Sequence, residues 1–119
     1  MCEIDVTALV LDHDPSDFSA SIAERGRNAA KETWENALAA PLFLAPEHLP
    51  AFRNYMRGFG AWEHDEIDNW TLQECNALFV QLVAGDLRSM PAGDGPLGLE
   101  WEGNLYPGSD GRYYYYIGT

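Results

Sequence analysis

Residues 71–85 carry the pattern that most restricts the fold, because they predict one amphipathic helix with both ends marked. Thr71 and Glu74 are three apart and form a capping box, in which each side chain binds the other's backbone N–H. Behind them, apolar residues recur three and four apart, as one face of a helix requires. These are Leu72, Cys75, Leu78, Phe79, Leu82 and Val83. Gly85 is typical of the residue just beyond a helix, so we expect the helix to end at 84.

Shorter apolar repeats predict further helices. They cover residues 27–40, 47–57 and 62–69. In the second of these, Pro50 fits only in the first turn, so that helix is expected to begin near Leu49. Residues 15–26 stay open between two interpretations. The four-residue spacing of Phe18 and Ile22 suits a helix, whereas their alternation with serines suits an extended segment.

Strands are expected near both ends of the chain. Residues 4–11 alternate in character and predict a strand. One face of that strand would carry Ile4, Val6, Ala8 and Val10. Residues 100–106 and 112–117 predict a β-hairpin, since Asp110–Gly111 between them is a strong turn signal. We therefore expect one domain over residues 1–119 of the α+β class. Three to four helices would pack with a small antiparallel sheet that includes the C-terminal hairpin.

The net charge of −12 narrows the class of partner that the chain can bind. The 19 acidic residues far outnumber the 7 basic ones, which are spread thinly along the sequence. Binding to phosphate backbones depends on clustered Lys and Arg, so we expect no direct nucleic-acid binding and no membrane binding. The surplus carboxylates predict a solubilising surface, or an acidic face offered to a basic protein.

The cysteines and the N-terminal residues indicate a cytoplasmic protein. Cys2 and Cys75 have neither C-x-x-C nor metal-ligand spacing, and unpaired thiols are typical of a reducing compartment. Glu3 and Asp5 stand where a signal peptide needs positive charge. No apolar run approaches the ~18 residues of a membrane-spanning helix. The turn at 108–111 lacks the Lys and Ser/Thr of a phosphate-binding loop, and no cofactor is expected.

The densest polar cluster lies within the short helix expected at 62–69. His64 and Asp68 are four apart and would share one helix face, a spacing that can hold a metal ion. A third ligand would have to come from elsewhere. The candidates for it are His48, His13, Asp12 and Asp14. The simpler interpretation is that the acids stabilise a helix N-terminus, where the dipole and the free N–H groups favour negative charge.

Two other clusters favour structural interpretations. Asp12-His13-Asp14 precedes a proline, where aspartate usually bonds the backbone of a turn. Ser19 and Ser21 lack the Gly-x-Ser-x-Gly setting of an activated nucleophile. Neither cluster identifies a catalytic residue.

Aromatic residues beside acids are stronger candidates for a binding site. Phe59 lies between two glycines, which permit unusual backbone angles, and Trp62 follows it. The tyrosines at 113–116 alternate across the hairpin, so one face would pack on helices and the other would display Tyr114 and Tyr116. Core packing and an ordinary sheet surface are the competing interpretations. The candidate interaction residues are Phe59, Trp62, Glu63, Asp65, Glu66, Asp68, Tyr114 and Tyr116.

Three segments resemble a family of short, acidic, uncharacterised bacterial proteins, mostly from proteobacteria. They read NAAKETWENAL at 28–38, GFGAW at 58–62 running through CNALF at 75–79 to Gly85-Asp86, and GRYYYYIG at 111–118. The resemblance covers most of the chain and implies a bacterial cytoplasmic setting. It implies no activity, ligand or catalytic residue.

Three functions are compatible with these patterns. The first is a non-enzymatic binding or accessory protein, whose acidic face meets a basic partner while Phe59, Trp62 or the tyrosines supply an apolar anchor. The second is a nucleic-acid mimic that inhibits a DNA-binding protein, and it would need a regular surface array of carboxylates. The third is a small metal-assisted hydrolase using His64 and Asp68, which lacks a defined further ligand. The first is therefore the leading prediction.

Overall fold

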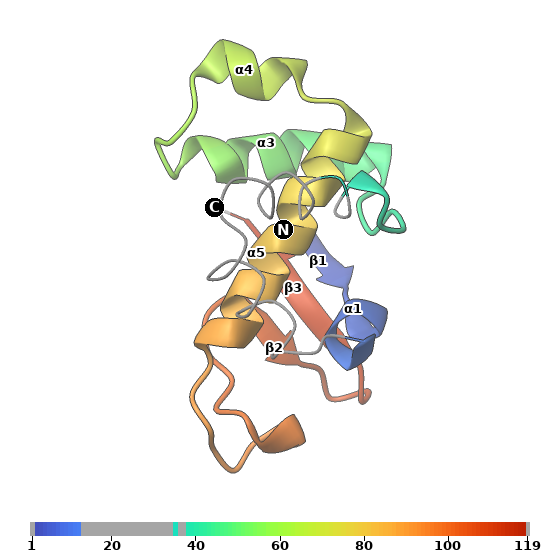
Figure 1. The fold of residues 1–119 in the computed structure, drawn as a ribbon, viewed down its shortest axis with the longest axis vertical. Helices are drawn as coiled ribbons and strands as arrows, with labels where there is room; N and C mark the ends of the chain where they lie inside the picture. Colours follow the sequence, from blue (N-terminus) through green and yellow to red (C-terminus); the bar gives the residue numbers. More distant parts are fainter. Residues whose placement is uncertain (1, 13–34, 36–37, 119) are drawn as a thin grey trace.

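The computed structural model describes residues 2–12, 35 and 38–118, and it has the predicted α+β architecture (Figure 1). The strands are β1 (Cys2–Asp5), β2 (Leu105–Pro107) and β3 (Tyr113–Ile117). The helices are α1 (Thr7–Asp12), α3 (Leu49–Arg57), α4 (His64–Asn69) and α5 (Leu72–Ser89), with 3₁₀ turns at Pro46–His48 and Pro96–Gly98. The ambiguous segment 15–26 lies outside the described residues. So does the helix expected at 27–40, apart from residues 35 and 38–40.

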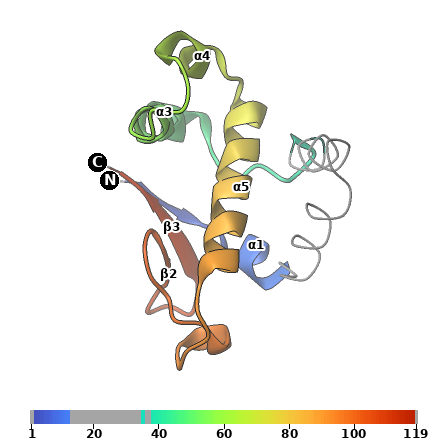
Figure 2. The same cartoon turned by 60° about the vertical axis from the view of Figure 1, so that its left-hand side comes forward.

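The central strand of the sheet is β3, which pairs antiparallel with β1 on one side and with β2 on the other. Tyr115 in the middle of β3 is opposite Ile4 in one pairing and Leu105 in the other. This confirms the predicted antiparallel sheet and its C-terminal hairpin. Figure 2 shows α5 packed along one face of the sheet, α3 across one end of α5, and α4 beyond α3.

The first strand is shorter than predicted, and the expectation of a strand over 4–11 is wrong. The chain leaves β1 at Asp5 and forms α1 from Thr7. The Asp5 carboxylate accepts bonds from the Thr7 N–H at 3.0 Å and from its hydroxyl at 2.6 Å, as a helix cap does. Together with Arg112, these Thr7 bonds lower the pKa of Asp5 to about 2. Val6 and Val10 are both buried, and their four-residue spacing suits a helix as well as a strand.

The second strand begins at Leu105, later than the predicted start at residue 100. Gly103 has a φ of +76°, which turns the chain just before β2. Upstream, the Trp101 indole donates to the Pro96 carbonyl at 2.8 Å and stacks on the Tyr113 ring. These contacts belong to a loop folded over the sheet end, so residues 100–103 do not extend the ladder, whereas the Asn104 carbonyl still accepts the Tyr116 N–H at 2.8 Å.

The predicted capping box of α5 is confirmed, with the Glu74 N–H bound to the Thr71 hydroxyl at 3.1 Å and the Thr71 N–H bound to Glu74 at 3.2 Å. The predicted end of α5 is wrong, because the helix continues through Gly85 to Ser89. The apolar stripe continues with it: Leu87 is buried and falls four residues after a buried valine. Packing of this last turn against the core outweighs the low helix propensity of one glycine.

Replacing Gly85 by alanine is expected to stabilise the protein by about 0.5–1 kcal/mol, since glycine is costly inside a helix. The added Cβ would lie 3.9 Å from the Arg88 side chain, an ordinary contact. Urea denaturation of the two forms measures the change. A comparable loss of stability would instead indicate a left-handed residue that ends the helix there.

The α3–α4 region follows the sequence closely. As predicted, α3 begins at Leu49 with Pro50 in its first turn, and Gly58 caps its C-terminal end. In contrast, α4 begins at His64 rather than at residue 62. Glu63 is extended and occupies the N-cap position of α4 without a side-chain capping bond, while the Trp62 ring lies edge-on to Trp70 with centroids 5.4 Å apart.

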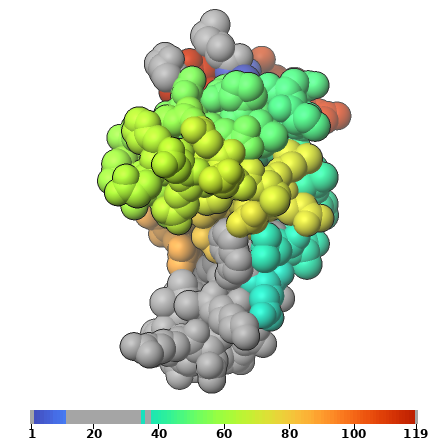
Figure 3. Space-filling view, turned by 90° about the horizontal axis from the view of Figure 1, so that it is seen from above, coloured from blue at the N-terminus to red at the C-terminus, as the bar shows by residue number. Residues whose placement is uncertain are grey.

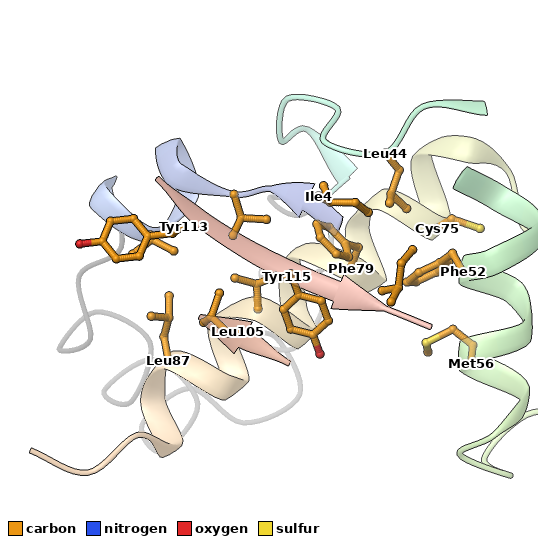
Figure 4. Packing of buried hydrophobic residues seen from close by; sticks show 14 of the residues in the cluster. Ile4, Leu44, Phe52, Met56, Cys75, Phe79, Leu87, Leu105, Tyr113 and Tyr115 are labelled. Carbon is orange, nitrogen blue, oxygen red and sulfur yellow. The ribbon is translucent and has the colours of Figure 1, made fainter. Parts of the chain in front are cut away.

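The core forms where α3, α5 and β3 meet. Figure 4 shows Phe52, Phe79 and Tyr115 pointing toward one another from these three elements. The Phe79 ring lies edge-on to Phe52 at 6.3 Å and to Tyr115 at 5.4 Å between centroids. Cys75 is fully buried beside them, as predicted, and burial raises the pKa of its thiol. The alternation of the β3 tyrosines is also confirmed, since Tyr113 and Tyr115 face the core.

Within the described ranges, none of the helices combines the length and the apolar character needed to cross a lipid bilayer.

Candidate interaction surface

The position of α4 is fixed by two arginines from α3. The Arg57 guanidinium bonds the Asp68 carboxylate and also donates to the Asn54 amide at 2.8 Å. One turn earlier, Arg53 donates to the Trp70 carbonyl at 2.8 Å. These contacts tie the last turn and the C-terminal end of α4 to α3. The first turn of α4 is left facing outward.

The outward turn of α4 is strongly acidic. Glu63, Asp65 and Glu66 are all exposed. Among the residues that the structure describes, none forms a hydrogen bond or an ion pair with their side chains. Asp65 and Glu66 also favour the helix locally, because they lie in the first turn where the free N–H groups are. Figure 3 shows the green and yellow-green surface of α3, α4 and their connection as a continuous area in the upper part of the view.

Phe59 lies on the connection between α3 and α4, four residues before Glu63, and 52% of its surface is exposed. Its ring is edge-on to Tyr55, one helical turn earlier, with centroids 5.2 Å apart. Gly60 follows with a φ of +68°, a conformation that directs the chain away from α3 and that side chains disfavour. Of the two interpretations for Phe59, core packing is wrong: the ring rests on α3 and is open to solvent.

Trp62 has a structural position. It is half-buried, it packs against the core, and its ring contacts Trp70 at the other end of α4. The two indoles thus bring together the segments that precede and follow α4. Trp62 therefore stabilises the connection between α3 and α4 from within, and it contributes little exposed surface area.

A chain of polar side chains lies beneath Tyr55. The Asn104 amide donates to the Tyr55 hydroxyl at 2.7 Å, and the Tyr55 and Tyr115 hydroxyls are 3.3 Å apart. Tyr115 also faces the Asp86 carboxylate on α5, whose pKa burial raises. An amide N–H only donates, so the Tyr55 oxygen accepts from Asn104, and either hydroxyl can donate in the Tyr55–Tyr115 contact. Burial foremost raises the pKa of Tyr115, and its phenol stays a donor.

The outer tyrosines of β3 are less available than the sequence predicts. Both Tyr114 and Tyr116 are half-buried. A Cβ on Gly108 would lie 2.6 Å from the Tyr114 ring, and one on Gly118 would lie 2.5 Å from the Tyr116 ring. Each ring is therefore packed on the bare backbone of a glycine. The Tyr114 hydroxyl also bonds Asp110, so this phenol already has a partner within the chain.

The histidines of the metal hypothesis do not meet in the described parts of the chain. His64 is exposed, and its intended partner Asp68 is bound by Arg57. The His48 Nδ1 accepts the Ala45 N–H at 2.9 Å and serves the local turn. Over residues 2–12, 35 and 38–118, no group of three or more His, Cys, Asp and Glu side chains is placed to hold a metal ion.

Several residues of that hypothesis, and both serines considered as nucleophiles, lie outside the described part of the chain. His13, Asp14, Ser19 and Ser21 lie outside the described residues, as does the side chain of Asp12.

Comparison with protein-family models, with curated proteins and with solved structures gives no match to this chain. The resemblance to a family of acidic proteobacterial proteins therefore stays a prediction.

Proposed function

We propose that this chain is a non-enzymatic binding protein that presents the α4 face to a basic protein partner. The α4 face is defined by Phe59, Glu63, Asp65 and Glu66. Its main support is that one short segment, residues 59–66, carries an exposed aromatic ring and three exposed carboxylates without partners among the described residues. An apolar ring in a charged setting is typical of protein interfaces, where aromatics carry binding energy and charges select the partner.

The rigidity of this face also supports binding. Arg57 and Arg53 hold the helix against α3, and the two tryptophans close its base. A surface that is already ordered loses little conformational entropy when a partner docks. The nucleic-acid mimic and the metal-assisted hydrolase stay predictions from the sequence alone.

The test removes three charges from the α4 face with the variant Glu63→Gln/Asp65→Asn/Glu66→Gln. A matched control, Asp94→Asn/Glu100→Gln/Glu102→Gln, removes three exposed charges from the loop at the opposite end of the molecule (Figure 1). We expect the control to keep a basic protein that the wild type retains at low salt, and the α4 variant to bind it about tenfold more weakly. That loss corresponds to roughly 0.5 kcal/mol for each exposed charge.

Quantitative capture on the three immobilised forms, followed by titration of the retained protein, gives the comparison. If both triple variants lose binding equally, the charge acts as a whole and no localised acidic face exists. Retention that is unchanged by raised salt would equally contradict the proposal, because exposed charges are screened.

A further inference from the structure

We infer that the basic partner inserts an apolar side chain, flanked by Lys or Arg, into a groove beside the α4 face. This inference rests on the proposed function and adds to it the kind of sequence that is recognised. The groove has a volume of about 370 Å³ and runs between the C-terminal end of α3 and the end of β3. It is lined by Asn54, Tyr55, Gly58, Phe59 and Gly118.

The groove is open because two of its walls are glycines. Gly58 and Gly118 place no side chain in it, whereas the rings of Tyr55 and Phe59 stand edge-on to each other along one side. A Cβ on Gly118 would meet the far end of the Tyr116 ring at 2.5 Å, so any larger residue there would displace that ring. The lining is predominantly apolar, so water in the groove forms few hydrogen bonds with the wall. An aliphatic or aromatic side chain therefore displaces that water favourably.

The groove is also formed before any partner arrives. The Tyr55 hydroxyl is fixed by Asn104 and Tyr115, which come from the sheet, so the wall cannot rotate without breaking buried hydrogen bonds. Phe59 rests on that fixed ring. A preformed apolar recess binds an anchor side chain with a small entropic cost.

Charge decides what flanks the anchor. Asn54 on the groove wall is bonded to Arg57, and Arg57 is bonded to Asp68 on α4, so the groove and the acidic helix are one side chain apart. The Arg57 charge is already neutralised by Asp68. The carboxylates of Glu63, Asp65 and Glu66 at the start of the same short helix are not, and their complement is a cation on the partner. The best fit is therefore a short basic segment with one apolar residue, not an anionic or a purely apolar ligand.

The experiment uses two peptides that differ only in the anchor, Ac-Arg-Arg-Leu-Arg-Arg-NH2 and its counterpart with alanine in place of leucine. Each is titrated into the ¹⁵N-labelled full chain and followed by the amide resonances. We expect the leucine peptide to bind three- to tenfold more tightly, as partial burial of the larger side chain implies. It should shift the amides of Gly58, Phe59 and Gly118 as well as those of α4.

Two variants locate the effect. Phe59→Ala should abolish the preference for leucine while leaving the charge-driven shifts in α4. Leu97→Ala removes an equally exposed apolar side chain from the distant loop and should leave the preference intact.

The outcomes separate the two claims. Equal affinity of the two peptides, with shifts in α4 only, would overturn the groove inference and leave the acidic binding face standing. If neither peptide shifts α4 more than it shifts the acidic loop at 94–102, the proposed function fails and the inference fails with it.

Discussion

The variant Phe79→Ala is expected to lose about 3–5 kcal/mol of unfolding free energy, the largest loss that we predict for a single change. Phe79 is fully buried and contacts both Phe52 on α3 and Tyr115 on β3. Its removal leaves a cavity where three elements meet, and the surrounding backbone can collapse only partly. A domain of this size has a total stability of roughly 6–18 kcal/mol, so a large share is lost. Urea denaturation followed by tryptophan fluorescence measures it.

Phe59→Ala is the matched control, because the chemical change is identical and the ring is half exposed. It should cost under about 1 kcal/mol, mainly the edge contact with Tyr55. If Phe79→Ala does not fold, Phe79→Leu replaces it, because leucine keeps most of the volume. We expect this variant to lose under about 1.5 kcal/mol of unfolding free energy relative to the wild type, so that its unfolding can still be measured. Similar losses for Phe79→Ala and Phe59→Ala would contradict the core described here.

Asn76→Ala is expected to lower the unfolding free energy by about 2–4 kcal/mol. Asn76 is a buried polar residue on α5, and its amide oxygen accepts the N–H groups of Phe43 and Leu44 at 2.8 and 3.2 Å. Its amide nitrogen donates to the Pro41 carbonyl at 3.1 Å. Alanine leaves these three backbone groups without their partner. Each unsatisfied buried group costs about 1–3 kcal/mol, reduced where water can enter.

Gln73→Ala provides the comparison for this second prediction, since it removes an exposed amide from the same helix. Its expected effect is within about 0.5 kcal/mol. Thermal and urea unfolding of both variants give the difference. Equal stability of Asn76→Ala and Gln73→Ala would mean that the 41–44 segment does not depend on α5 for its hydrogen bonds.

Signals that are local in sequence predicted the fold best. The capping box of α5 and the turn at Asp110–Gly111 each involve side chains within three or four residues, so the sequence shows the complete interaction. The start of α3 was predictable for the same reason, because a proline excludes every position except the first turn. Phe59 was found as an interaction candidate through its two glycine neighbours.

The wrong predictions depended on contacts that are distant in sequence. Val6 and Val10 satisfy the spacing of a strand and of a helix, and the choice is made by the Asp5 cap together with the bond from the Val6 N–H to the Tyr113 carbonyl. Gly85 is a residue type that commonly follows a helix, yet α5 continues beyond it because Leu87 packs in the core.

The buried polar groups were missed for a related reason. Asn76 lies between apolar neighbours on α5, and its three partners are more than 30 residues away. The link from Tyr55 to Asn104 and Tyr115 spans an even greater separation. Periodicity identifies which face of a helix is apolar, but it cannot show that a tyrosine hydroxyl reaches a partner in another element. The sequence therefore could not predict that Tyr55 is held in place as one wall of the groove.

The central claim is that the partner docks on the α4 face, and hydrogen–deuterium exchange of the full chain tests it directly. Exchange is compared with and without the basic protein that the wild type retains. We predict slower exchange in residues 57–70 on binding, together with the end of β3 at Gly118. Protection confined to the loop at 91–102 or to α1, with residues 57–70 unchanged, would contradict it.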